Sequence, residues 1–102
     1  MKKELAEKLK KINISMKKHG FIIEGFFGSH ARGDAKKTSD LDLLYSINNV
    51  FLSQNKGFAY FQKLEEIKSI LSKKLKKEID LAPKNNLSKT GEKYILSEVI
   101  YV

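Results

Sequence analysis

Apolar residues recur at helical spacing in two long stretches of this 102-residue chain. In residues 2–19, and again in residues 58–77, apolar positions return every three or four residues among charged ones, which predicts two amphipathic helices. The apolar positions are Leu5, Leu9, Ile12 and Met16 in the first stretch, and Phe58, Phe61, Leu64, Ile67, Leu71 and Leu75 in the second, with Ile70 at its margin. Gly20 follows three basic residues and is suited to end the first helix.

Three shorter runs have the composition or the alternation of β-strands. Residues 21–27 are rich in aromatic and β-branched side chains, residues 40–47 begin with polar and apolar positions in alternation, and residues 78–82 form a short run before Pro83. Between the second run and the second helix, we interpret residues 48–57 as a polar connection with an apolar centre.

The C-terminal part of the sequence predicts smaller elements. We expect a loop over residues 84–88, a last helix over residues 90–96 with Thr90 as its N-cap, and an extended segment over residues 98–102. The elements together predict an α/β (α+β) fold, with a small mixed sheet of three or four strands and helices mainly on one face. The length predicts a single domain that spans residues 1–102.

Two aspartates, Asp40 and Asp42, open the second predicted strand one residue apart. Side chains at positions i and i+2 share a face of a strand, so both carboxylates are expected to point the same way. Negative charges this close raise each other's pKa, and a divalent cation cancels their repulsion directly. Oxygen ligands favour a hard ion, Mg²⁺ or Mn²⁺. One member of such a pair can instead cap a turn or pair with a lysine, so the pair alone does not establish a metal site.

A possible phosphate site lies upstream of these aspartates. The run over residues 21–27 ends at Gly28, and the residues that follow suggest a tight turn into a short helix. Gly28 lets the backbone approach a ligand closely, and backbone amides from Ser29 onward would face an anion. Ser29 adds a hydroxyl group, and Arg32 can add a bidentate guanidinium group. A phosphate site beside paired carboxylates is suited to the chemistry of a nucleotide with a divalent metal ion.

Composition narrows the class of protein. The chain has no cysteine, which excludes disulfides and thiolate metal sites. No apolar run is long enough to cross a bilayer, and the charged N-terminus lacks the apolar centre of a signal peptide, so we expect a cytoplasmic protein. The net charge of +8 comes almost wholly from lysines spread over the predicted helices, and Arg32 is the only arginine. Without aromatic residues among those lysines, we favour solvated helix faces over a nucleic-acid surface.

The residues of the turn and of the aspartate pair together resemble a known signature. The pattern G-S-x-A-R-G followed by S-D-x-D-L is matched by Gly28, Ser29, Ala31, Arg32, Gly33, Ser39, Asp40, Asp42 and Leu43. It resembles the signature of the nucleotidyltransferase superfamily related to DNA polymerase β. The chain is most similar to the minimal nucleotidyltransferases, the MNT proteins that are encoded beside HEPN-domain partners.

This resemblance implies a third site carboxylate and a reaction. In the polymerase β-like fold, a third acidic residue lies on the strand beside the D-x-D strand, and Asp80 occupies that position, with Glu78 as a weaker substitute. The resemblance implies that Asp40, Asp42 and Asp80 hold Mg²⁺, two ions in all, with Mn²⁺ as a possible replacement. It implies ATP as the nucleotide, transfer of AMP to a tyrosine of a HEPN-domain toxin, and an antitoxin role in a toxin–antitoxin pair.

Two other functions stay open at this point. One is an inactive antitoxin that keeps the fold and acts by binding alone, which the intact set of three aspartates argues against. The other is a transferase that acts on nucleic acid, which the positive charge suggests.

Five further polar residues in or before this region have other interpretations. We interpret His19 as a helix-capping residue and Asp34 as a turn residue. His30 occupies the variable position of the motif, where it could contact a nucleotide or a metal or serve as an ordinary turn residue. Lys36 and Lys37 could reach a triphosphate or be solvated, and the sequence does not separate these possibilities.

Overall fold

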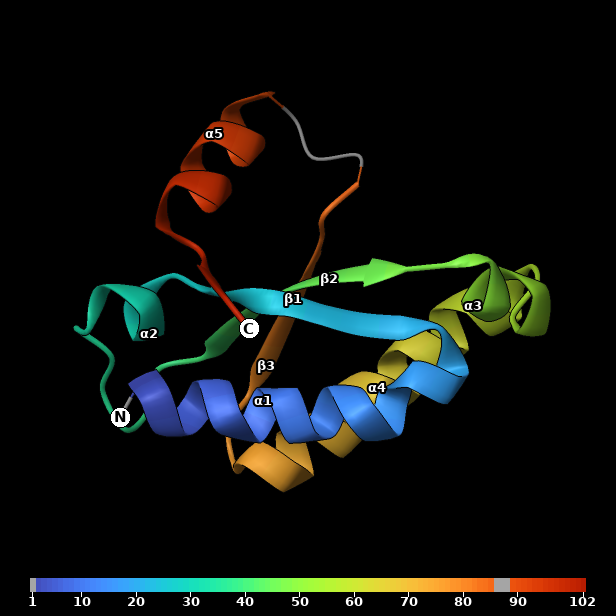
Figure 1. Cartoon of the computed structure of the whole chain (residues 1–102), viewed down its shortest axis with the longest axis horizontal. Coiled ribbons are helices and arrows are strands. Elements are labelled where there is room, and N and C mark those ends of the chain that lie inside the picture. The colour runs from blue at the N-terminus through green and yellow to red at the C-terminus, as the bar shows by residue number, and fades with distance from the viewer. Residues whose placement is uncertain (1, 86–88) are drawn as a thin grey trace.

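A computed structural model describes residues 2–85 and 89–102, and within them four strands form one mixed sheet (Figure 1). The strands lie in the order β3-β2-β1-β4, where β1 is Phe21–Phe27, β2 is Leu41–Ile47, β3 is Ile79–Pro83 and β4 is Ile100–Tyr101. The helices are α1 (Lys2–Met16), α2 (Ser29–Arg32), α3 (Asn49–Gln54), α4 (Phe58–Leu75) and α5 (Lys89–Glu98), and a 3₁₀ turn, Lys17–His19, follows α1.

The sheet is mixed because one of its pairings is parallel. β1 pairs antiparallel with both β2 and β4, whereas β2 and β3 run parallel. A parallel pair needs a crossover between its strands, and α3 and α4 provide it. Figure 1 shows α1 and α4 on one side of the sheet and α5 on the other. The predicted fold class, a small mixed sheet with helices mainly on one face, is confirmed.

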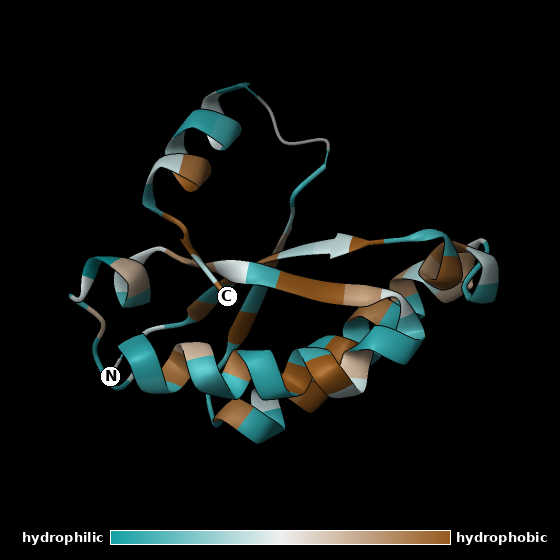
Figure 2. Ribbon diagram, in the orientation of Figure 1, coloured by the Kyte–Doolittle hydropathy of each residue, from teal (hydrophilic) through white to brown (hydrophobic). Residues whose placement is uncertain are grey.

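The core lies between the sheet and the helices α1 and α4. Leu9, Ile12 and Met16 of α1 are buried, as their spacing predicts, and Gly20 ends this segment with a left-handed φ of 72°. Phe21 and Tyr45 stack in neighbouring strands with ring centroids 5.1 Å apart. Figure 2 shows hydrophobic residues along α1, α4 and β1. Within the described residues, no helix is long and apolar enough to span a membrane.

The connection between β2 and α4 differs from its prediction. Residues 48–57 contain the helix α3, where Asn48 caps the first turn by accepting a hydrogen bond of 2.9 Å from the N–H of Val50. Phe51 is fully buried and fixes α3 against the core. A helix of six residues has too few positions to show a period, so the sequence pattern did not reveal it.

The first turn of α4 also differs from its prediction. Phe58 and Phe61 were assigned to the buried stripe but are 86% and 66% exposed. Tyr60 instead faces the core, where its ring packs edge-on against Phe51 with centroids 5.5 Å apart. The core-facing stripe thus continues from Leu64 back to Tyr60, four residues earlier, because α3 supplies the packing surface at that end of the helix.

Near the C-terminus, the ends of β3 and α5 differ slightly from their predicted positions. Pro83 lies inside β3, at the edge of the sheet where its missing N–H is tolerated. Thr90 lies inside α5 and is not its N-cap, and α5 extends to Glu98, past the predicted end at residue 96. The predicted loop over residues 84–88 lies partly outside the described residues.

Candidate active site

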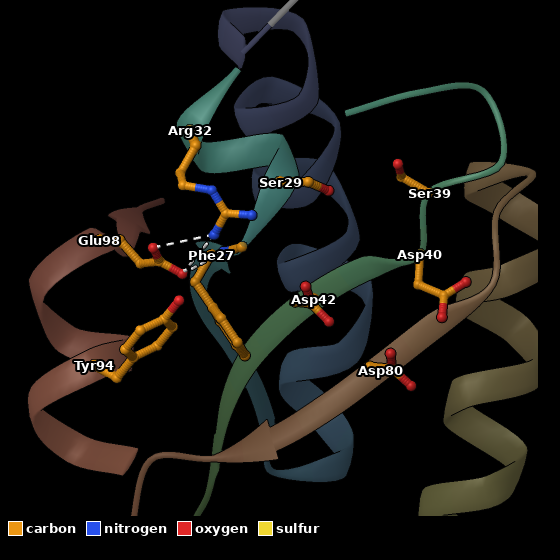
Figure 3. Close-up of a pocket in the computed structure, with 10 residues that line it drawn as sticks. Phe27, Ser29, Arg32, Ser39, Asp40, Asp42, Asp80, Tyr94 and Glu98 are labelled. Atoms are coloured by element: carbon orange, nitrogen blue, oxygen red, sulfur yellow. Dashed lines mark hydrogen bonds and ion pairs between the residues drawn. The ribbon is translucent and has the colours of Figure 1, made fainter. Parts of the chain in front are cut away.

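Three adjacent strands bring a row of residues together at one end of the sheet. The register pairs Phe27 of β1 with Asp42 of β2, and Asp42 with Asp80 of β3. Asp40 lies just before β2 and is exposed, and Asp42 is half-buried. Figure 3 shows the three carboxyl groups beside one another along the ends of β2 and β3. The fold therefore brings together the three aspartates that the sequence singled out.

A cavity of about 420 Å³ lies over these carboxylates. Its lining contains all six predicted site residues and four others: Phe27, Gly28, Ser29, Arg32, Ser39, Asp40, Asp42, Asp80, Tyr94 and Glu98. Glu78, the weaker substitute for Asp80, lies before β3 and borders a different cavity. The cavity thus joins the predicted phosphate residues and the predicted metal ligands.

The electrostatics of the cavity centre on Asp42. Burial raises the pKa of its carboxyl group above the ordinary value, and the neighbouring Asp80 and Asp40 raise it further. Among residues 2–85 and 89–102, no group of three or more His, Cys, Asp or Glu side chains is arranged so that it could hold a metal ion. The donor set nevertheless fits a hard divalent cation in its chemistry, since its donors are all carboxylate oxygens and a cation would relieve their repulsion.

Gly28 makes the bend between β1 and α2 possible. Its φ of 73° and ψ of −149° are accessible to glycine at little cost, and a Cβ atom at this position would overlap the carboxylate of Asp42. The bend therefore packs directly against the central aspartate. Ser29 begins α2 immediately after this bend and lines the same cavity.

Glu98 holds the bend and Arg32 together, and the sequence did not indicate it. Its carboxylate accepts a hydrogen bond of 3.0 Å from the N–H of Gly28 and contacts Nη1 of Arg32 at 3.3 and 3.4 Å. Nε of Arg32 donates to Asp34 at 3.4 Å, and the hydrogen bonds to Asp34 and Glu98 raise the pKa of Arg32 further above its high ordinary value. Nη2 has no hydrogen-bond partner within the described residues. Figure 3 shows one terminal nitrogen of Arg32 directed at Glu98 and the other turned towards Ser29.

Of the remaining polar residues near the motif, Ser39 lines this cavity, whereas His30, Lys36 and Lys37 lie elsewhere. The hydroxyl of Ser39 accepts a hydrogen bond of 2.8 Å from the N–H of Lys36, which closes the loop before β2. His30, Lys36 and Lys37 do not line the catalytic cavity but border a second one. The alternative in which these three residues contact a nucleotide in the catalytic cavity is thus not supported by their positions.

The glycine–serine bend at Gly28 faces carboxylates on the adjacent strands of a small mixed sheet, and the residues of this bend and of β2 carry the motif that resembles the nucleotidyltransferase signature. The family described as "Nucleotidyltransferase domain" matches residues 2–102, and the chain belongs to this family. It is an enzyme of the nucleotidyltransferase class and of the minimal, MNT, type.

A named relative and a solved structure support this assignment. A protein adenylyltransferase, MntA, of Thermococcus cleftensis is 36% identical over 78 residues, which cover 76% of this chain and 71% of the relative. A solved structure assigned as a minimal nucleotidyltransferase superposes with a TM-score of 0.70 at 25% identity, and covers 98% of this chain and 94% of the other.

The raised pKa of Asp42 predicts a pH-dependent effect of removing its charge. Because the folded-state pKa lies above the unfolded one, ionisation of Asp42 costs stability as pH rises through this interval, and the cost persists at neutral pH. We expect Asp42→Asn to raise the free energy of unfolding at pH 7, and to lose this advantage below the ordinary aspartate pKa. Urea denaturation across that pH range measures both effects, and a pH-independent change would contradict this explanation.

The contacts of Glu98 predict different effects for two substitutions. Glu98→Ala removes the acceptor of the Gly28 N–H, and we expect a loss of about 1 kcal/mol in the free energy of unfolding. Glu98→Gln keeps an acceptor oxygen at this position and serves as the matched control, with a smaller loss. Urea denaturation measures both variants. Equal losses would show that the Gly28 hydrogen bond does not hold the bend.

Proposed function

We propose that the chain transfers AMP from ATP to a hydroxyl group of a partner protein, with Mg²⁺ as the metal and Mn²⁺ as a possible replacement. Nucleotidyl transfer itself follows from the family. The observation that supports metal-dependent transfer at this site is the pairing of Asp42 with Asp80 across β2 and β3, opposite the bend at Gly28. This pairing puts acidic side chains of two strands at the cavity that the bend borders.

The phosphates of ATP would be bound at the bend. Gly28 and Ser29 border the cavity at the start of α2, and the Ser29 hydroxyl can donate a hydrogen bond to a phosphate oxygen. Asp34 and Glu98 hold two edges of the Arg32 guanidinium and leave Nη2 available, so Arg32 can contact a phosphate without losing its position.

Asp40, Asp42 and Asp80 would hold two Mg²⁺ ions. When bound, these ions would neutralise the carboxylates and the phosphates and would stabilise charge on the attacking and leaving oxygens. The three aspartates supply the negative charge and the oxygen donors that such ions need. Burial raises the pKa of Asp42 most, and repulsion from Asp80 and Asp40 raises it further. This repulsion is the physical reason to expect a cation between the three carboxylates.

The nucleotidyl group is transferred directly to the acceptor, without a covalent enzyme intermediate. The acceptor oxygen forms a bond to the α-phosphorus of ATP, the bond between that phosphorus and the bridging oxygen breaks, and pyrophosphate leaves with the bonding electrons. The proton of the acceptor hydroxyl passes to a base, and the exposed carboxylate of Asp80 would help to remove it. The remaining residues of the cavity orient the two reactants.

A protein is the acceptor class that the comparisons favour. The relative MntA is named a protein adenylyltransferase. The resemblance to MNT proteins adds a specific partner, a HEPN-domain toxin with a tyrosine as the acceptor, and an antitoxin role for this chain. We propose this pair as the biological context.

This proposal predicts labelling of the partner. With labelled ATP, Mg²⁺ and a HEPN-domain protein encoded beside it, the purified chain should transfer the label to that protein and release pyrophosphate. The Asp40→Asn, Asp42→Asn double variant should fold, as circular dichroism would show, and lose at least about 100-fold in labelling rate because both ligand charges are gone.

Three other outcomes would change the assignment. Normal labelling by the double variant would refute the metal ligands. If the unsubstituted chain and the double variant both neutralise the toxin without labelling it, the result would favour an antitoxin that acts by binding. Labelling of RNA or DNA in place of the protein would favour the nucleic-acid-directed alternative.

A further inference from the structure

A second cavity, of about 500 Å³, lies on the other side of the motif helix α2. It is bordered by the first turns of α1, the loop at residues 33–37 and the end of α4. A Cβ atom at Gly33 would lie 3.7 Å from the end of the Lys2 side chain, so the loop and α1 approach each other closely here. The two cavities share no lining residue, and the second is therefore a separate site.

The lining of this cavity is strongly basic. Its cationic residues are Lys2, Lys8, Lys36, Lys37 and Lys77. Glu4 is its single acidic residue, and no carboxylate of the described residues forms an ion pair with any of these lysines. Unpaired cations around one cavity leave a positive potential that an anionic ligand would neutralise.

His30 lines the same cavity and carries a buried polar atom without a partner. Its Nε2 is buried and has no hydrogen-bond partner, alone among the side-chain nitrogens and oxygens of the described residues. A buried polar atom of this kind costs free energy unless something bonds to it. Ser29 and Arg32 line the catalytic cavity, whereas His30 of the same short helix lines the second one.

The inner wall of the cavity is apolar. Leu5 of α1, Ala35 of the loop and Leu75 of α4 contribute to it, together with the methylene groups of the lysines. The volume lies within the range of small-molecule sites. No aromatic residue lines it, so it lacks the stacking platform of a single-stranded nucleic-acid site. The ligand that fits is small, anionic at one end and less polar at the other.

We propose that this cavity is a second nucleotide site, which binds a nucleoside phosphate independently of the catalytic cavity. The lysines neutralise the phosphate, the apolar wall contacts the base, and the His30 side chain borders the bound ligand. In this site His30, Lys36 and Lys37 contact a ligand, whereas none of them lines the catalytic cavity.

The chain has two histidines, which makes the site observable by NMR of the imidazole rings. AMP is titrated without metal into the full chain carrying Ser29→Ala and Arg32→Ala, which weaken binding at the catalytic cavity. The His30 ring signals should shift until they saturate. The signals of His19, in the 3₁₀ turn that follows the far end of α1, should stay in place.

Paired charge variants then separate this site from general electrostatics. Lys36→Ala with Lys37→Ala should weaken AMP binding at least about tenfold, because it removes two cations from the cavity. Lys10→Ala with Lys11→Ala removes the same charge from exposed positions of α1 outside the cavity, and should change the affinity less than about twofold.

Two NMR results would overturn the proposal: His30 ring signals that do not shift with AMP, or equal shifts of the His30 and His19 signals. Two binding results would also overturn it: equal losses of AMP affinity in the two lysine double variants, or tighter binding of inorganic phosphate or of a short single-stranded RNA than of AMP. The labelling assay with the unsubstituted chain tests the catalytic cavity separately. Labelling without a His30 response refutes this proposal alone, and a His30 response without labelling refutes only the proposed function.

Discussion

The parallel pairing of β2 with β3 is the constraint on which the site depends, because it fixes two negative charges opposite each other. The register aligns Asp42 with Asp80. The other four aligned pairs consist of residues with largely apolar side chains: Leu41–Ile79, Leu43–Leu81, Leu44–Ala82 and Tyr45–Pro83. A slip of one residue would turn the apolar side chains out of the core. The burial of Leu41, Leu43 and Ile79 therefore holds a repulsive pair of carboxylates in place.

The bend at Gly28 and the last helix depend on this arrangement in turn. Gly28 packs against Asp42 so closely that no side chain fits, and its N–H is bound by Glu98 from the far end of the chain. Glu98 also holds Arg32, so β1, α2 and α5 meet at one carboxylate. The cavity is thus defined by backbone pairing, by the absence of one side chain and by one long-range set of hydrogen bonds. Each of these restricts where a nucleotide can lie.

The sequence predicted the parts of the structure that are encoded locally. The periodic spacing of Leu9, Ile12 and Met16 and the D-x-D alternation specified α1 and β2. The motif predicted five of the six site residues that line the cavity, and the resemblance to the polymerase β-like fold predicted the sixth, Asp80. Glu98 was missed because its partners lie 66 and 70 residues away and nothing local marks them. The exposed Phe58 and Phe61 were assigned to the core because spacing alone does not show that α3 covers this end of α4.

We propose that Asp80 joins Asp40 and Asp42 around metal ions when a nucleotide is bound. The most direct test is Mn²⁺ binding, followed by electron paramagnetic resonance with ATP present, in the unsubstituted chain, in Asp80→Asn and in the matched control Glu78→Gln. We predict that Asp80→Asn weakens Mn²⁺ binding at least about tenfold and that Glu78→Gln leaves it unchanged. Unaltered binding in Asp80→Asn, or a loss in Glu78→Gln instead, would contradict the assignment of Asp80 as a metal ligand.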